Sequence, residues 1–183
     1  MTTFALVTTI ASIVLLCAFL AISIKFFGLL PSYSAYNLEW DKKVPMHNVH
    51  LWSIVTIVIA LLFMPALIEL GEGNPWQFLG FFSPMYLIVV AIFPLTELPE
   101  DASDYQRKEW ERKRRIHAIG AALCAAVTTL WIFLVCNLWW VALLALFIVG
   151  CCAFATRTEK TSTVFWLEMA LFLGGYSAIL IMS

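Results

Sequence analysis

The sequence predicts an all-α, polytopic membrane protein in which residues 1–183 form one domain, a bundle of six transmembrane helices. Of its 183 residues, 62% are hydrophobic and only 13% are charged, and the mean hydropathy is +0.90. One soluble core of this size does not bury so much apolar surface. The apolar residues form long runs without the alternation of barrel strands, so helices are the expected spanning elements.

Six runs have the length of about 20 mostly apolar residues that a spanning helix needs. They cover approximately Phe4 to Phe27, His50 to Leu70, Trp76 to Leu95, Ile116 to Cys136, Leu138 to Thr156 and Thr163 to Met182. The first run has no Lys or Arg before it and no Ala-x-Ala site after it, which favours a retained span over a cleaved signal peptide. Asn137 separates the fourth and fifth runs, so we expect these two helices to pack as close antiparallel neighbours.

The longest connection, residues 96–115, changes from acidic to basic along its length. We expect its second half, from Tyr105 onward, to be helical and continuous with the fourth run. Glu109 and Lys113 would then form an i,i+4 ion pair on that helix.

The basic residues predict the orientation of the chain in a cell membrane. All 11 lie at the first, third and fifth connections, namely Lys25, Lys42, Lys43, Arg107, Lys108, Arg112, Lys113, Arg114, Arg115, Arg157 and Lys160. Loops rich in Lys and Arg stay in the cytoplasm. The odd-numbered connections should therefore be cytoplasmic, and both the N and C termini should lie outside.

The densest basic run suggests a partner. Arg112, Lys113, Arg114 and Arg115 would attract anionic lipid, each charge near the surface contributing about 1 kcal/mol. The same run is also explained as a topology signal alone. The net charge is −1, so we expect membrane lipids and no nucleic acid as partners.

All three histidines lie at the predicted cytoplasmic ends of even-numbered spans. His47 and His50 precede the second run, at a spacing that suits two ligands of one metal ion, and His117 opens the fourth run. Three imidazoles with a nearby carboxylate would make a zinc site with an open position for water. The competing interpretation is that these are interfacial or hydrogen-bonded structural histidines.

Glu168 lies about five residues into the sixth run. An ionised carboxylate that faces lipid near the bilayer centre costs about 2.5 kcal/mol or more, so we expect Glu168 to face the bundle. Its candidate partners are His117, Tyr36 and Lys25. Glu168 is either a functional carboxylate or an acceptor that holds the packing together.

Several short motifs resemble a known family. They are Pro31 to Tyr36, Gln77-Phe78-Leu79, Phe93-Pro94, Ile116 to Ala121 and Phe165 to Glu168. Together they resemble a family of small six-helix membrane proteins of Bacteroides-type bacteria with no assigned activity, and they are more distantly similar to the DRAM/Sfk-type six-helix membrane family. The resemblance implies a bacterial inner-membrane location and, broadly, membrane lipid handling. It singles out Ser34, His117 and Glu168 as site residues and does not include His47 or His50.

Three functions follow as hypotheses, and the residues leave open whether the protein is an enzyme. The first is binding of a lipid headgroup or membrane partner at a polar cytoplasmic mouth. The second is a metal-dependent intramembrane lipid hydrolase, in which the histidines and an acid bind zinc or act as base and Ser34 assists. The third is a small transporter or channel with Glu168 as the coupling carboxylate. Gly174-Gly175 with Ser177 offers a small-residue face on which a homo-oligomer could form.

Overall fold

The computed structural model describes residues 1–44, 50–155 and 163–183, and the regular elements in these ranges are all helical, as the fold class predicts. In chain order they are α1 (Thr3–Phe27), the 3₁₀ turn η1 (Tyr33–Ala35), α2 (Tyr36–Lys43), α3 (Leu51–Leu70), α4 (Phe78–Ile92), α5 (Asp104–Leu134), α6 (Trp139–Ala155) and α7 (Thr163–Met182). A helix is thus present in each of the six predicted runs, and α2 is an additional short helix.

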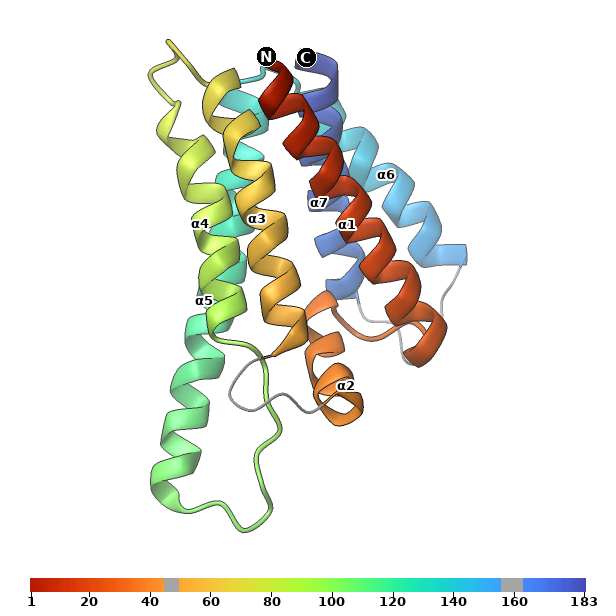
Figure 1. The fold of residues 1–183 in the computed structure, drawn as a ribbon, viewed down its shortest axis with the longest axis vertical. Coiled ribbons are helices and arrows are strands. Elements are labelled where there is room, and N and C mark those ends of the chain that lie inside the picture. The colour runs from red at the N-terminus through yellow and green to blue at the C-terminus, as the bar shows by residue number, and fades with distance from the viewer. Residues whose placement is uncertain (45–49, 156–162) are drawn as a thin grey trace.

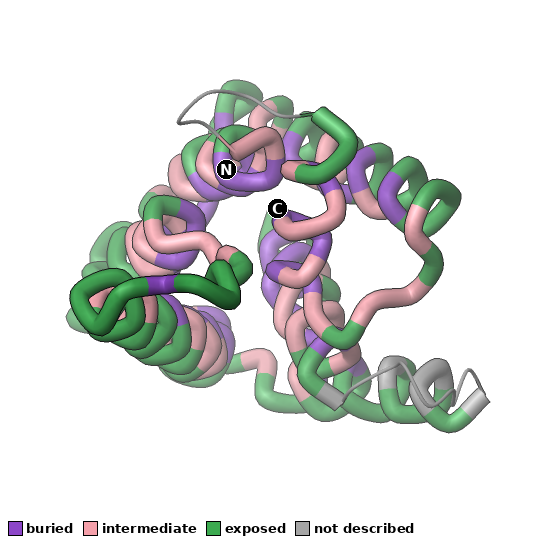
Figure 2. Tube along the Cα trace, turned by 90° about the horizontal axis from the view of Figure 1, so that it is seen from below, coloured by how far each residue is buried: buried purple, intermediate pink, exposed green. Residues whose placement is uncertain are grey.

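The long helices run roughly along the axis of a bundle (Figure 1). Both termini lie side by side at one end, which we call the terminal end, and α2 lies at the other, the α2 end. α7 contacts α3, α5 and α6, and its Tyr176 is joined to Ser12 of α1 by a 2.6 Å hydrogen bond. Figure 2 accordingly shows the C-terminus near the middle of the ring of helices, so α7 is the central helix.

Four of the described helices are long and apolar enough to cross a membrane, which supports the prediction of a membrane protein. They are Thr3–Phe27, Leu51–Leu70, Asp104–Leu134 and Val164–Met182. α4 and α6 are apolar but shorter. The 15 residues of α4 extend about 22 Å, against about 30 Å of bilayer hydrocarbon.

α4 is shorter than the predicted run for a local reason. Residues 75–77 form a turn before it, and the helix ends at Ile92, with Phe93 N–H making the last helical bond to Val89. Pro94 has no N–H to continue the helix, and its ring disfavours a helical conformation at the residue before it. Pro94 therefore ends the helix before the end of the predicted run, Trp76 to Leu95.

α5 confirms the prediction made for the longest connection. It begins at Asp104, one residue before Tyr105, and continues without a break to Leu134. Ser103 and Gln106 form a capping box that starts it: the Ser103 hydroxyl accepts from Gln106 N–H, and the Gln106 side chain accepts from Ser103 N–H. Lys113 Nζ lies 2.9 Å from Glu109 Oε1, as the i,i+4 spacing predicts.

The turn after α5 is tight, but its two helices do not stay together. Asn137 has a φ of 54°, a left-handed conformation that Asn tolerates better than most residues. Beyond the turn, α6 packs mainly on α7 and contacts α5 far less. A side groove of about 380 Å³, lined by residues of α5, α6 and α7 including Phe133, Leu143 and Leu171, separates them, so the predicted close pairing holds only at the turn.

Glycines set the closest helix contacts. A Cβ added to Gly80 of α4 would lie 2.7 Å from the carbonyl carbon of Leu67 and closer still to its oxygen, so α3 and α4 touch backbone to backbone there. A Cβ at Gly175 would lie 3.2 Å from Phe63 of α3, and one at Gly174 would lie 3.6 Å from Ala145 of α6. The Gly174-Gly175 face therefore packs within the chain, and the homo-oligomer stays a prediction without its support.

Candidate functional site

The predicted site residues Ser34 and Glu168 meet at the α2 end, where the segment after α1 folds against the start of α7. Phe165 N–H, one of the donors that a helix start leaves unpaired, donates to Pro31 O at 3.1 Å. Tyr33 N–H donates to Glu168 Oε2 at 2.7 Å. These two bonds clamp η1 onto α7. Glu168 thus faces the bundle as predicted, but its partner is the Tyr33 backbone rather than His117, Tyr36 or Lys25.

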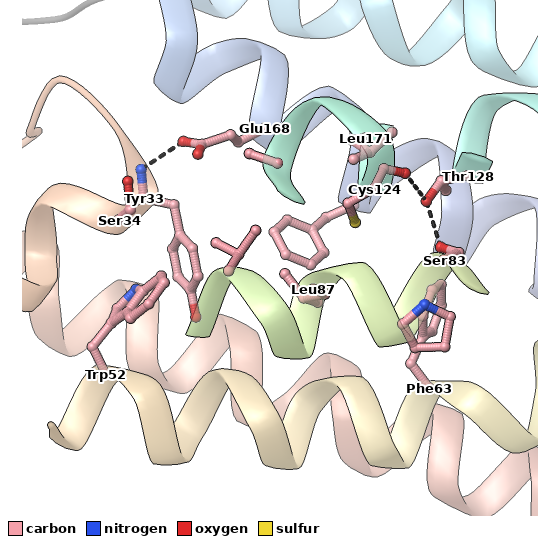
Figure 3. Close-up of a pocket in the computed structure, with 14 residues that line it drawn as sticks. Tyr33, Ser34, Trp52, Phe63, Ser83, Leu87, Cys124, Thr128, Glu168 and Leu171 are labelled. Atoms are coloured by element: carbon pink, nitrogen blue, oxygen red, sulfur yellow. Dashed lines mark hydrogen bonds between the residues drawn. The ribbon is translucent and has the colours of Figure 1, made fainter. Parts of the chain in front are cut away.

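An inner cavity of about 60 Å³ lies beside this clamp, between η1 and helices α3, α4, α5 and α7 (Figure 3). Its polar end carries Ser34, Trp52 and Glu168, and most of its remaining wall is apolar. At the far end, the hydroxyls of Ser83 and Thr128 lie 2.5 Å apart and satisfy each other. A volume of this size admits a few water molecules or part of a small ligand.

Ser34 is buried, and its hydroxyl lies 3.1 Å from that of Ser32. Ser32 in turn caps η1 by accepting from Ala35 N–H. In the described part of the chain, Ser34 makes no hydrogen bond to His117 or Glu168. The contact between nucleophile and base that a hydrolytic triad needs is therefore not assembled in this conformation, and the catalytic roles of these residues stay predictions.

His117 lies outside the lining of the inner cavity. It is buried on α5, with Nδ1 2.8 Å from the carbonyl oxygen of Phe93 and 3.2 Å from that of Val90. A carbonyl only accepts, so Nδ1 carries the hydrogen. The Val90 carbonyl would bond to residue 94 in a continuous helix, but Pro94 has no N–H to donate. His117 supplies the missing donor and caps the end of α4.

The predicted metal set is only partly described. His50 Nδ1 lies 2.6 Å from Asp41 Oδ2, at the junction of α2 and α3. His117 bonds α4 instead, and His47 falls outside the described residues. Among residues 1–44, 50–155 and 163–183, no three His, Cys, Asp or Glu side chains lie close enough to hold one metal ion. A zinc site that includes His47 therefore stays a prediction.

The predicted lipid-binding run is a solvent-facing part of α5. Arg112, Lys113, Arg114 and Arg115 are all exposed. Lys113 pairs with Glu109, and the Arg114 guanidinium lies 5.3 Å from the Trp110 ring centre, within cation–π range.

Trp110 is itself fixed, since its Nε1–H donates to Thr96 O at 2.7 Å. Across the same end, Lys42 Nζ lies 2.7 Å from Glu97 Oε1, and this hydrogen bond raises the pKa of Lys42. Burial raises the pKa of Tyr36, whose hydroxyl donates to Gly28 O. The predicted polar mouth at the α2 end therefore consists of side chains that bond α1, α2 and α5 to the segments that connect the helices.

Of the residues that line the cavity, sequence reasoning predicted only Ser34 and Glu168 as site residues; Trp52 and Tyr33 are among those it missed. Trp52 is fully buried, and Tyr33 stacks obliquely on it with ring centres 5.4 Å apart. Tyr33 also shares a 3.1 Å hydrogen bond with Thr56. Trp52, Ser53 and Thr56 are polar-capable residues clustered in one apolar run, and that cluster is the signal that could have marked this face of α3 as interior.

Comparison with protein-family models, curated proteins and solved structures finds no match for this chain. The resemblance to small six-helix membrane proteins therefore remains an expectation drawn from short motifs.

Proposed function

We propose that the protein is a six-span bacterial inner-membrane protein that binds anionic lipid headgroups at the cytoplasmic face, with both termini outside. The spans would be α1, α3, α4, α5, α6 and α7. All nine basic residues of the described ranges belong to α1's last turn, α2 and the first half of α5, which lie at the α2 end. The positive-inside rule then favours this end as cytoplasmic. The short α4 fits a locally thinned bilayer.

The length of α5 is the observation that carries this proposal. Its 31 residues extend about 46 Å at about 1.5 Å per residue. A hydrocarbon core of about 30 Å accommodates about 20 of them. Counted back from Leu134, the hydrocarbon then ends near Arg115. The run Arg112 to Arg115 therefore falls at headgroup level, on a rigid helix that projects beyond the bundle (Figure 1).

Two of the four charges are available for phosphate. Lys113 is paired with Glu109 and Arg114 stacks on Trp110. Arg112 and Arg115 are exposed and form no ion pair with any residue that the structure describes. A guanidinium presents a planar fork of donors that matches phosphate oxygens. At about 1 kcal/mol for each charge near the surface, the two arginines would strengthen anionic-lipid binding roughly 30-fold.

Native mass spectrometry of the detergent-extracted protein, titrated with phosphatidylglycerol and with phosphatidylethanolamine, tests the proposal. We expect preference for the anionic lipid and its loss in the double variant Arg112→Gln/Arg115→Gln. The matched control, Lys42→Gln/Lys43→Gln, removes two charges from the same end but not from α5. Equal affinity for both lipids, or equal losses of anionic-lipid affinity in the two double variants, would mean that the basic run only sets the orientation of the chain.

A further inference from the structure

We propose that a hollow on the exposed part of α5 selects an anionic phospholipid whose phosphate carries a hydroxylated head, with Arg115 at the phosphate and Glu111 at a head hydroxyl. This inference rests on the proposed function, because it names the class of anionic lipid that the basic run of α5 would take. It adds a selectivity that charge alone does not give, since lipids of equal charge differ in the groups beyond the phosphate.

This hollow, which we call the α5 hollow, has a volume of about 400 Å³ and is lined by Trp110, Glu111, Arg114, Arg115 and Ala118. Sites for small molecules in proteins commonly have about 300–1,000 Å³. The five residues lie on one side of α5, because positions three, four and seven apart share a face of a helix. Ala118 has the smallest side chain of the set, which leaves room between the longer ones.

Part of the wall of the α5 hollow is held in place. The Nε1–H of Trp110 donates to Thr96 O at 2.7 Å, which ties the indole ring to the connection before α5. The Arg114 guanidinium lies 5.3 Å from the centre of that ring, within cation–π range. Arg115 is exposed and forms no ion pair with any residue that the structure describes. The hollow therefore combines an ordered positive wall with an arginine whose donors are free for a phosphate.

The order of these residues along α5 matches the order of the groups in a phospholipid. With the hydrocarbon ending near Arg115, Ala118 lies about 4.5 Å further into the membrane, at the edge of the hydrocarbon. Arg114 and Arg115 lie at the level of the phosphate. Glu111 lies about 6 Å beyond Arg115 along the helix axis, on the side away from the membrane. Only the part of a headgroup that follows the phosphate reaches this level.

Glu111 determines what the head has to offer. Its side chain is exposed and forms no ion pair within the described part of the chain, and an ionised carboxylate only accepts hydrogen bonds, so the head must donate. Both a hydroxyl and an ammonium group donate. However, the four positions three and four residues from Glu111 are all basic, namely Arg107, Lys108, Arg114 and Arg115. They are its neighbours on the helix surface and repel an ammonium head, whereas a hydroxyl is uncharged.

Native mass spectrometry with three lipids of the same acyl chains tests this assignment. They are phosphatidylglycerol, phosphatidylethanolamine and phosphatidylmethanol, which has the charge of phosphatidylglycerol but no head hydroxyl. We expect the wild type to bind phosphatidylglycerol about three- to fivefold more tightly than phosphatidylmethanol, the range of one net hydrogen bond. Glu111→Ala should abolish this preference and raise the affinity for phosphatidylmethanol, because it removes a negative charge near the phosphate. Glu111→Gln should keep part of the preference, since its amide oxygen still accepts.

The chain offers a matched control in Glu109. Its carboxylate pairs with Lys113 and does not line the α5 hollow, so Glu109→Ala should change the affinities for both anionic lipids alike. Equal affinity of the wild type for the two anionic lipids, both above phosphatidylethanolamine, would overturn this proposal and leave the headgroup proposal standing. An unchanged preference in Glu111→Ala, or its loss in Glu109→Ala as well, would also overturn it. Equal affinity for all three lipids would overturn both proposals.

A soluble competitor separates a lipid from a free phosphate ester. Glycerol 3-phosphate offers a phosphate and hydroxyl groups without acyl chains. We expect that an excess of it leaves phosphatidylglycerol bound, because Ala118 places the inner end of the hollow at the edge of the hydrocarbon. Displacement of the lipid would overturn the assignment to a phospholipid and favour a soluble phosphate ester.

Discussion

Two fully buried tryptophans mark two differently built regions of the bundle. Toward the terminal end, Trp131 donates its Nε1–H to Leu67 O at 3.2 Å, and Gly80 brings α3 and α4 into backbone contact beside it. Toward the α2 end, Trp52 lines a cavity, and its Nε1 has no hydrogen-bond partner among the described residues. In the first region the indole donor is satisfied and two helices touch backbone to backbone. The second has a buried donor without a partner among the described residues, next to a cavity of about 60 Å³.

The largest expected effect tests how rigidly the first region is packed. Gly80→Ala would place a Cβ against the Leu67 backbone, which cannot move aside as a side chain can. We expect α3 and α4 to separate and the free energy of unfolding to fall by about 3 kcal/mol, as measured by denaturant titration in mixed micelles. Gly150→Ala on α6 is the control, because a Cβ there meets nothing within 4 Å. Similar results for both variants would show that the contact is not tight.

The next effect compares the two tryptophans directly. Trp131→Phe and Trp52→Phe remove the same atoms from fully buried positions. Trp131→Phe leaves the Leu67 carbonyl, near the end of α3, without its donor, whereas Trp52→Phe removes an N–H that was unsatisfied. We expect Trp131→Phe to be the more destabilising by about 2 kcal/mol. Thermal unfolding of both variants in one detergent measures the difference, and equal losses would mean that Trp52 is satisfied in solution.

A smaller effect is expected at His117, where the structural and the metal interpretations diverge. His117→Ala removes the donor to the Phe93 and Val90 carbonyls, which we expect to cost about 1–2 kcal/mol. If His117 only caps α4, a chelator will not change the stability of the wild-type protein. Stability that falls on chelation, together with stoichiometric zinc lost in His117→Ala, would instead favour the metal site.

The sequence predicted what depends on composition and on local signals. The apolar runs, the helix from about Tyr105 onward, the Glu109–Lys113 spacing and Asn137 at the turn are all local signals, and each of these helices or contacts is present. Glu168 was also placed correctly, because the cost of an ionised carboxylate in lipid requires an inward position. Its partner was not predicted, since the bond to Tyr33 N–H joins residues 135 positions apart.

The interior arrangement could not be predicted for a physical reason. Inside a bilayer the lipid-facing and bundle-facing sides of a helix are both apolar, so the amphipathic pattern that identifies the buried face of a soluble helix is weak. Only the small polar cluster Trp52, Ser53 and Thr56 distinguishes the interior face of α3 from the rest of its apolar run. The pairing of α6 with α7 rather than α5 was hidden for the same reason, and the side groove between α5 and α6 with it.

The smallest effect on the fold is expected at the exposed part of α5. Arg112→Gln should leave the stability unchanged, since Arg112 is exposed, and should weaken anionic-lipid binding about fivefold. The screening length falls from about 10 Å at 0.1 M salt to about 3 Å at 1 M. High salt should therefore erase the difference between the wild type and Arg112→Gln. A difference between the wild type and Arg112→Gln that is the same at both salt concentrations would contradict a contact made through the charge of Arg112.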